Sequence, residues 1–168
     1  MKLKENVTGK EAIYETDVAF EIKDKIIYLD FVARHSLLFS YSDKYNDKLY
    51  QGDACEIFVD FGNKTHYLEI EVAPNNTLFI ALVDKVDKSL TFLENNFVES
   101  KTEKYLDGYK ASLIIDLKAL DKDVTEIKYN IFRIETDGGK ENAHLFALNP
   151  TLCGTFHVQD KFLKTNVK

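Results

Sequence analysis

The sequence predicts an all-β protein, an antiparallel β-sandwich formed by one domain over residues 1–168. Apolar residues recur at every second position along many short segments, with turn-forming residues between them, and helical periodicity is almost absent. The chain contains 12 Phe and 9 Tyr but only 2 Pro and no Trp, and Phe and Tyr suit the half-buried surface of a sheet. About nine or ten short strands with turns between them are typical of a sandwich.

The first half of the chain predicts a hairpin, a long loop and a three-stranded meander. Val18, Phe20 and Ile22 alternate with polar residues and are followed by a tight turn. Residues 26–33 are nearly all apolar, which predicts a strand buried on both faces. Residues 34–52 form a long polar stretch with four aromatic residues, and loops of that length usually have a function. The meander strands are expected at 53–61, 66–72 and 77–83, with turns at 62–65 and 74–76.

The second half predicts four further strands and an irregular tail. Strands are expected at 97–104, 109–117, 126–135 and 144–148, the first of them at a sheet edge. Turns or loops are expected at 84–96, 107–108 and 137–139, with a helical turn at 118–120 and the tail at 150–168.

Composition and charge narrow the classes of partner. A net charge of −6 and a pI near 5.3 argue against nucleic acid and against anionic lipid, both of which need a basic face. The sequence contains no run of about 18 apolar residues, so no membrane-spanning helix is predicted. The polar start at Met1 has no secretory signal, so we expect a cytoplasmic protein if Met1 is the native start. Cys55 and Cys153 are then expected to be free thiols.

The central strands predict a face rich in carboxylates. By parity, the core face contains Cys55, Ile57, Val59, Leu68, Ile70 and Val72. The turn at 62–65 would then place Glu56 opposite Glu71 and Phe58 opposite Glu69, all on the other face. Like charges opposed across a sheet are destabilising, so a cation, a metal or a polar ligand is expected to compensate them.

Arg133 is the candidate cation. It is one of only two arginines among the 22 Lys and Arg residues of the chain, and its planar fork of donors distinguishes it from Lys. If Phe132 and Ile134 face the core, Arg133 lies on the face of Glu56. Such an arrangement fits a site for hydroxyl groups, and it equally fits an Arg–Glu pair that only holds the sheet together.

Two tyrosines of the long loop are candidates for the rim of this face. Tyr45 and Tyr50 lie near Asp53, where the first meander strand begins. A ring covers the C–H face of a sugar while charged groups bind its hydroxyls. The alternative is that these tyrosines anchor the loop to the sandwich.

Other polar residues give weaker signals. The four His residues lack the spacing of metal ligands. Asp84, Asp87 and Glu94 raise the question of calcium, but their spacing matches no calcium loop, so a solvated acidic loop is favoured and no cofactor is expected. Glu69 and Glu71 could serve a hydrolase, although neighbouring positions on an open sheet rarely flank a scissile bond.

Two stretches resemble the family 9 carbohydrate-binding modules and their free-standing relatives. The first runs from Tyr50 to Val72 and reads YQGDACEIFVDFGNKTHYLEIEV, which is similar to an aromatic residue followed by the family's Asp-x-x-Glu-Ile-Phe strand and its Tyr-x-Glu-x-Glu-Val return. The second lies between Tyr129 and Phe162 and contains NIFRIE and LFALNPTLCGTFHVQDKF, which is similar to the family's Asn-x-x-Arg-Ile strand and its Pro-Thr and Phe-His elements.

The resemblance implies a jelly-roll-like β-sandwich that binds sugars without catalysis. In the family, two aromatic rings sandwich a sugar while Glu, Arg and Asn side chains hold its hydroxyls. Tyr50 stands at the position of the first ring and Arg133 at the family's Arg. Leu148 and Asn149 stand where the second ring is expected, which implies weak binding of a single sugar or a different ligand.

Three hypotheses about function follow. The favoured one is a carbohydrate-binding domain with a saccharide ligand and without nucleic-acid or membrane partners. Its candidate ligand-binding residues are Tyr45, Tyr50, Glu56, Glu71, Arg133 and Asn149. The alternatives are a small glycoside hydrolase that uses Glu69 or Glu71, and a protein-interaction sandwich that has lost its sugar site.

Overall fold

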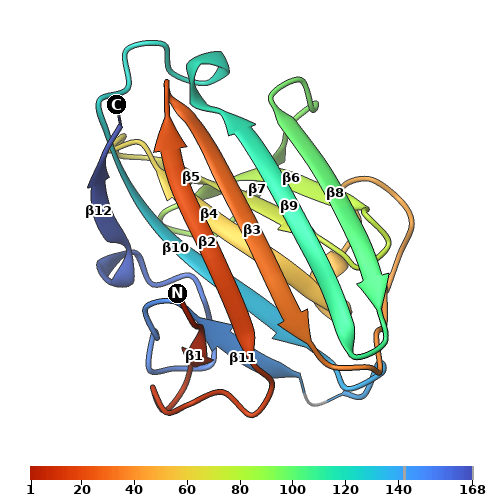
Figure 1. Ribbon diagram of the computed structural model, residues 1–168. Helices are drawn as coiled ribbons and strands as arrows, with labels where there is room; N and C mark the ends of the chain where they lie inside the picture. Colours follow the sequence, from red (N-terminus) through yellow and green to blue (C-terminus); the bar gives the residue numbers. More distant parts are fainter. Residues whose placement is uncertain (142, 168) are drawn as a thin grey trace.

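Two antiparallel sheets pack face to face in the computed structural model, which describes residues 1–141 and 143–167 (Figure 1). The larger sheet has the order β1 (Lys4–Glu5), β11 (His144–Ala147), β10 (Glu126–Glu135), β4 (Ala54–Asp60), β5 (His66–Val72), β6 (Leu78–Asp84) and β7 (Leu90–Phe92), with β12 (Leu163–Asn166) also paired to β10. The smaller sheet has the order β2 (Thr16–Lys23), β3 (Ile26–Arg34), β9 (Gly108–Asp116) and β8 (Val98–Tyr105).

Nearly half of the chain is strand, and the only helical segments among the described residues are three 3-10 turns, η1 (Leu49–Gln51), η2 (Leu117–Ala119) and η3 (Gln159–Lys161). The all-β prediction is therefore confirmed. None of the described segments forms a helix long and apolar enough to cross a membrane.

The nine strands predicted from periodicity are all present, and the segment at 97–104 is an edge strand as expected. The structure adds three strands. β7 and β12 lie in segments that were predicted to be loop or irregular tail, and β1 lies in the N-terminal segment, for which no element was predicted. Each contains two to four residues. Such short segments carry too few alternations to show a period of two, so their pairing partners define them as strands.

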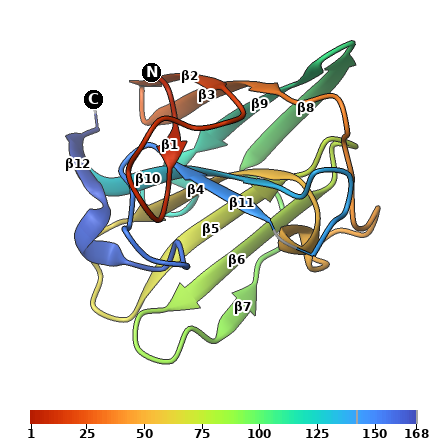
Figure 2. The same cartoon turned by 90° about the horizontal axis from the view of Figure 1, so that it is seen from below.

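The predicted pairing of the two central strands is confirmed. β4 and β5 pair with Glu56 opposite Glu71 and Phe58 opposite Glu69. The predicted core residues lie between the two sheets together with Leu29, Phe31 and Leu113 of the smaller sheet. The two layers are seen edge-on in Figure 2.

The prediction that residues 26–33 are buried on both faces is wrong. Burial alternates along β3, because the outer face of the smaller sheet is open to solvent and leaves Tyr28 exposed. β4, like most of β5, has both faces buried. A second apolar cluster covers its outer face and includes Phe58, Phe132, Phe156 and Phe162.

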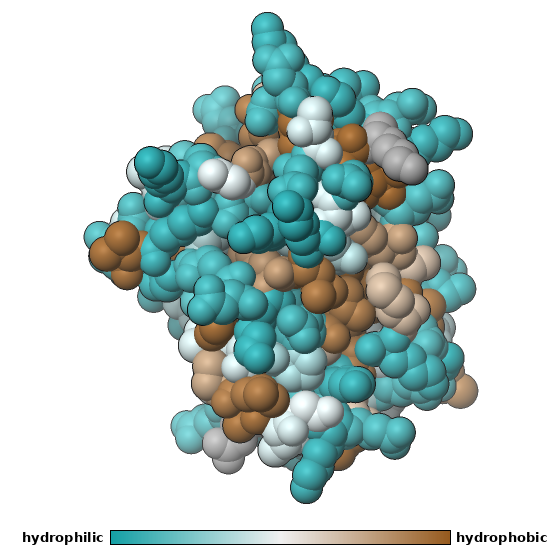
Figure 3. Space-filling view, turned by 90° about the vertical axis from the view of Figure 1, so that its left-hand side faces the viewer, coloured by the Kyte–Doolittle hydropathy of each residue, from teal (hydrophilic) through white to brown (hydrophobic). Residues whose placement is uncertain are grey.

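The outer surface formed by the edge of the sandwich is mainly polar. Hydrophilic side chains cover most of the face in Figure 3, and hydrophobic side chains lie in small groups between them. Three buried acidic residues, by contrast, lie on the covered outer face of the larger sheet, namely Glu56, Glu69 and Glu71.

Candidate functional site

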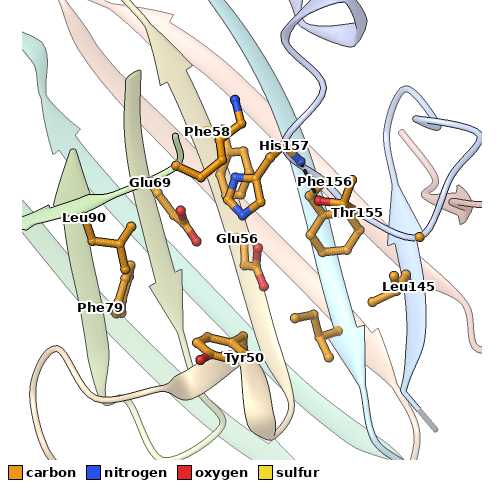
Figure 4. Close-up of a pocket in the computed structure, with 13 residues that line it drawn as sticks. Tyr50, Glu56, Phe58, Glu69, Phe79, Leu90, Leu145, Thr155, Phe156 and His157 are labelled. Carbon is orange, nitrogen blue, oxygen red and sulfur yellow. Dashed lines mark hydrogen bonds between the residues drawn. The ribbon is translucent and has the colours of Figure 1, made fainter. Parts of the chain in front are cut away.

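A pocket of about 310 Å³ opens on the outer face of the larger sheet (Figure 4). Its floor comes from the central strands, and its rim comes from loops and from the edge strand β7. The floor residues are Glu56 and Phe58 of β4, Glu69 of β5, Phe79 of β6, Ile134 of β10 and Leu145 of β11. The rim residues are Tyr50, Lys88, Leu90 and the segment from Gly154 to His157.

Three buried carboxyl groups dominate the chemistry of this region. Glu56 and Glu69 line the pocket, and Glu71 lies fully buried beside them. Among the described residues, no side-chain or backbone donor reaches Oε1 of Glu56, Oε2 of Glu69 or either carboxyl oxygen of Glu71, and Glu69 and Glu71 bond to each other only through a proton that one of the two carboxyls carries. Buried polar atoms are nearly always paired, so these oxygens indicate a ligand, water or bound protons.

Burial raises the pKa of all three groups. It raises the pKa of Glu69 to about 7, with a hydrogen bond to Glu71 acting in the opposite direction. The pKa values of Glu56 and Glu71 are raised well above the ordinary value, first by burial and then by the neighbouring carboxylates. The cluster therefore retains protons at pH values where exposed glutamates are ionised.

Two aromatic side chains stand on opposite sides of the carboxyl groups of Glu56 and Glu69 (Figure 4). Tyr50 is 46% exposed and faces the pocket from η1. His157 stacks on Phe58 at a centroid distance of 5.2 Å, and its Nδ1 lies 2.5 Å from the Tyr67 hydroxyl.

His157 supplies a donor to the pocket. Burial lowers its pKa to about 4, so the ring is neutral at neutral pH. Burial also raises the pKa of Tyr67, so the phenol keeps its proton and can donate it to Nδ1 in the tautomer of His157 that carries its proton on Nε2. The proton of the neutral imidazole is then on Nε2, which is left as a hydrogen-bond donor.

Asp53 holds the loop that carries Tyr50. Its buried carboxylate accepts hydrogen bonds from Phe39 N at 2.6 Å and from Thr136 N and Oγ1 at 2.8 and 2.6 Å. Gly52 lies against the same loop, and a Cβ there would be 2.7 Å from Tyr41 N. The lack of a side chain at residue 52 lets the loop cross the start of β4 and place η1 at the pocket.

The prediction that Arg133 shares a face with Glu56 is wrong. In the β10–β4 register Arg133 lies opposite Cys55, on the face between the sheets, and Phe132 lies opposite Glu56. Its guanidinium forms a salt bridge with Glu135 and donates to Thr16 Oγ1 at 2.9 Å. Arg133 is fully buried and neutralises Glu135, so it does not compensate Glu56 and Glu71.

The structure brings only part of the predicted site together. Tyr50 and Glu56 line the pocket, and Glu71 lies behind its floor. Tyr45 lies outside the lining and donates its hydroxyl to Leu93 O at 2.6 Å, which fits the loop-anchor alternative. Asn149 also lies outside the lining, and its side chain donates to Lys161 O at 2.8 Å.

The sequence analysis missed the rim on the side of the C-terminal tail. Phe156 and His157 belong to the Phe-His element of the resemblance. Phe156 was predicted only to anchor the irregular tail, no role was predicted for His157, and Lys88 was not considered. Phe156 stacks on Phe132 at a centroid distance of 4.2 Å, so it forms a wall of the pocket. Only its hydrophobicity at the start of an irregular tail could have signalled such packing.

The acidic loop does not form a cluster of ligands. Asp84 Oδ1 accepts hydrogen bonds from Val86 N and Asp87 N, and Asp87 Oδ1 accepts one from Ser89 N. These contacts stabilise the β6–β7 turn. Within residues 1–141 and 143–167, no group of three or more His, Cys, Asp or Glu side chains is arranged to hold a metal ion.

The fold is that of a carbohydrate-binding module family 9-like β-sandwich, although no family model matches the chain and no curated protein matches its sequence. A candidate carbohydrate-binding protein from Bacteroides uniformis superposes with a TM-score of 0.76 at 15% identity, covering 99% of this chain and 85% of that protein. A family 9 module from Caldicellulosiruptor kristjanssonii superposes with a TM-score of 0.69 over 99% of this chain and 83% of its own, at 17% identity in its glucose complex and 18% in its cellotriose complex. The fold implied by the sequence motifs is confirmed.

Proposed function

We propose that this protein is a non-catalytic carbohydrate-binding domain and that a sugar occupies the pocket between Tyr50 and His157. The observation that carries this proposal is the set of unpaired carboxyl oxygens of Glu56 and Glu69, which are almost fully buried yet line an open cavity. A ligand with several hydroxyl groups would satisfy these acceptors. A volume of about 310 Å³ is at the small end of ligand pockets, which span about 300–1,000 Å³.

Each side of the pocket has a distinct role in this proposal. The exposed ring of Tyr50 stacks on the apolar face of the sugar, and Glu56 and Glu69 accept hydrogen bonds from its hydroxyls. His157 donates through Nε2 to a hydroxyl or ring oxygen. The binding of glucose and cellotriose by the Caldicellulosiruptor module supports a saccharide as the ligand class.

The placement of the acids favours binding over hydrolysis. Glu56 and Glu69 come from adjacent strands and lie side by side on the floor of the pocket. Glycosidases place their two carboxyl groups on either side of the scissile bond. A sugar resting on this floor has both groups beneath it.

Calorimetric titration with glucose and with cellotriose tests the proposal. We expect Tyr50→Ala to weaken binding by about fivefold or more, because loss of an aromatic anchor at a binding site costs more than about 1 kcal/mol. The melting temperature should change little, since the ring is 46% exposed.

Tyr28→Ala is the matched control, because Tyr28 is 39% exposed on the open face of the smaller sheet. Equal affinities for the Tyr50→Ala protein and the wild type would remove Tyr50 from the site. An absence of binding heat with every saccharide tested would reject the proposed function.

A further inference from the structure

We propose that the pocket prefers a saccharide that carries a protonated amine, an amino sugar, over neutral and acidic sugars. This inference rests on the proposed function and specifies the chemical class of its ligand. It follows from the excess of acceptors over donors and cations around the pocket floor.

The floor presents acceptors that the protein does not satisfy. Glu56 and Glu69 point their carboxyl groups into the cavity (Figure 4), and each has an oxygen without a partner among the described residues. Glu71 lies beside them, and a proton shared with Glu69 is its one link to another side chain among the described residues. Three acids thus share one buried region, with Arg133 directed to the opposite face of the sheet.

The other titratable groups that face the floor do not neutralise it. His157, from the tail, is a neutral ring bonded to Tyr67 of β5. Tyr50, from η1, is a phenol. Lys88, from the β6–β7 turn, donates through Nζ to Lys85 O at 2.8 Å, lies 5.8 Å from the centre of the Tyr67 ring and forms no salt bridge within the part of the chain that the structure describes.

An ammonium group complements this arrangement more closely than a hydroxyl does. It offers three donors and no acceptor, whereas each hydroxyl offers one donor and carries no charge. Hydrogen bonds between a cation and a carboxylate are about twice as strong as neutral ones. A sugar carboxylate would instead add a fourth acid, so uronic acids should bind worst.

Binding of the cation should be coupled to proton release. The free cluster holds protons because burial and mutual repulsion disfavour its ionised form. An ammonium ion favours the ionised form, so protons leave the cluster for solvent when the amino sugar binds. Affinity for the amino sugar should therefore increase as the pH rises toward about 7, the pKa of Glu69.

The test is calorimetric titration of glucose, glucosamine, N-acetylglucosamine and glucuronate at about pH 6.5, where a sugar amine is largely protonated. We expect glucosamine to bind at least about tenfold more tightly than glucose and N-acetylglucosamine, and glucuronate to bind most weakly. Repeating the glucosamine titration in buffers with different ionisation enthalpies should reveal proton release that glucose does not produce.

Two variants separate the pocket from the overall charge. Glu69→Gln should reduce the ratio of glucosamine to glucose affinity severalfold, because it removes one of the two carboxyl groups that line the floor. Glu99→Gln makes the same chemical change at an exposed position on β8 of the other sheet and should leave the ratio unchanged.

The outcomes distinguish this inference from the proposed function. Binding of glucose with equal or weaker binding of glucosamine would overturn the inference and leave the proposed function standing. Methylammonium is titrated in parallel as a cation without a sugar ring. If it binds as tightly as glucosamine, the pocket is a cation site without sugar recognition, which would overturn both the inference and the proposed function. An absence of binding by all four sugars would also overturn both.

Discussion

Replacement of Glu69 by Gln should change how the stability of the protein depends on pH. Folding raises the pKa of this carboxyl from the ordinary 4.5 to about 7. A group with a raised pKa in the folded state contributes stability that is complete below the unfolded pKa and is lost as the pH rises through the folded pKa. One pKa unit corresponds to about 1.4 kcal/mol, so the contribution lost between about pH 4 and pH 8 is on the order of 3 kcal/mol.

The assay is urea unfolding at a series of pH values, followed by circular dichroism, for wild type, Glu69→Gln and Glu99→Gln. The quantity that matters is the free energy of unfolding of the wild type minus that of Glu69→Gln. We expect this difference to fall by about 3 kcal/mol from about pH 4 to about pH 8. Glu69 also raises the pKa values of Glu56 and Glu71 by repulsion. Removal of Glu69 lowers these two pKa values, so it adds to the fall of the difference with rising pH.

The wild-type curve alone does not test the reasoning, because His157 titrates in the opposite sense over part of the range. The difference between the two proteins cancels that contribution. A difference that is constant with pH, or that increases with pH, would refute the burial of an unpaired carboxyl at this position. A matching change in Glu99→Gln would attribute the effect to net charge.

Three further predictions follow from the buried groups. Burial lowers the pKa of His157 from 6.5 to about 4. The free energy of unfolding of the wild type minus that of His157→Gln should therefore rise by up to about 2–3 kcal/mol between about pH 4 and pH 6.5 in the same urea series. A difference that falls over this range would contradict the burial of a neutral ring. Arg133→Met should lower the free energy of unfolding by about 3 kcal/mol or more, because it leaves Glu135 buried without its arginine. Sugar affinity should be unchanged. Weaker binding at unchanged stability would place Arg133 in the binding site. A thiol reagent should label Cys153 in the native protein and Cys55 only after unfolding. Burial raises the pKa of Cys55 to about 12, whereas hydrogen bonds lower the pKa of Cys153. A protein that shows no free thiol after denaturation would contradict the assignment of both cysteines as free thiols.

The sequence predicts the β4–β5 pairing correctly because an alternating pattern on both strands and a short turn between them allow one register. The same reasoning fails for β10. Ile127, Tyr129 and Ile131 face the core on the side of Arg133, while Phe132 and Ile134 are buried on the outer face. Both faces of this strand are apolar, so parity has two solutions, and a charged residue on the inner face favours the wrong one.

The two aromatic walls of the pocket could not be predicted from periodicity because two distant segments carry them. The loop before β4 supplies Tyr50 and the tail after β11 supplies His157, and a buried polar residue fixes each segment. Asp53 binds the first segment. Asn6 binds the second through Thr151 N at 2.9 Å, Thr151 Oγ1 at 2.7 Å and Cys153 O at 2.9 Å.

Asp53 begins the predicted strand at 53–61 and Asn6 lies in the polar N-terminal segment, and the alternating pattern does not show which distant segment either residue binds. Each becomes informative only when its partners, 83 and 145 residues away along the chain, are known. The strands thus fix the acidic floor, and two buried hydrogen-bond clusters fix the distance between the aromatic walls above it. The width of the pocket, and with it the size of the ligand it accepts, depends on residues that do not touch the ligand.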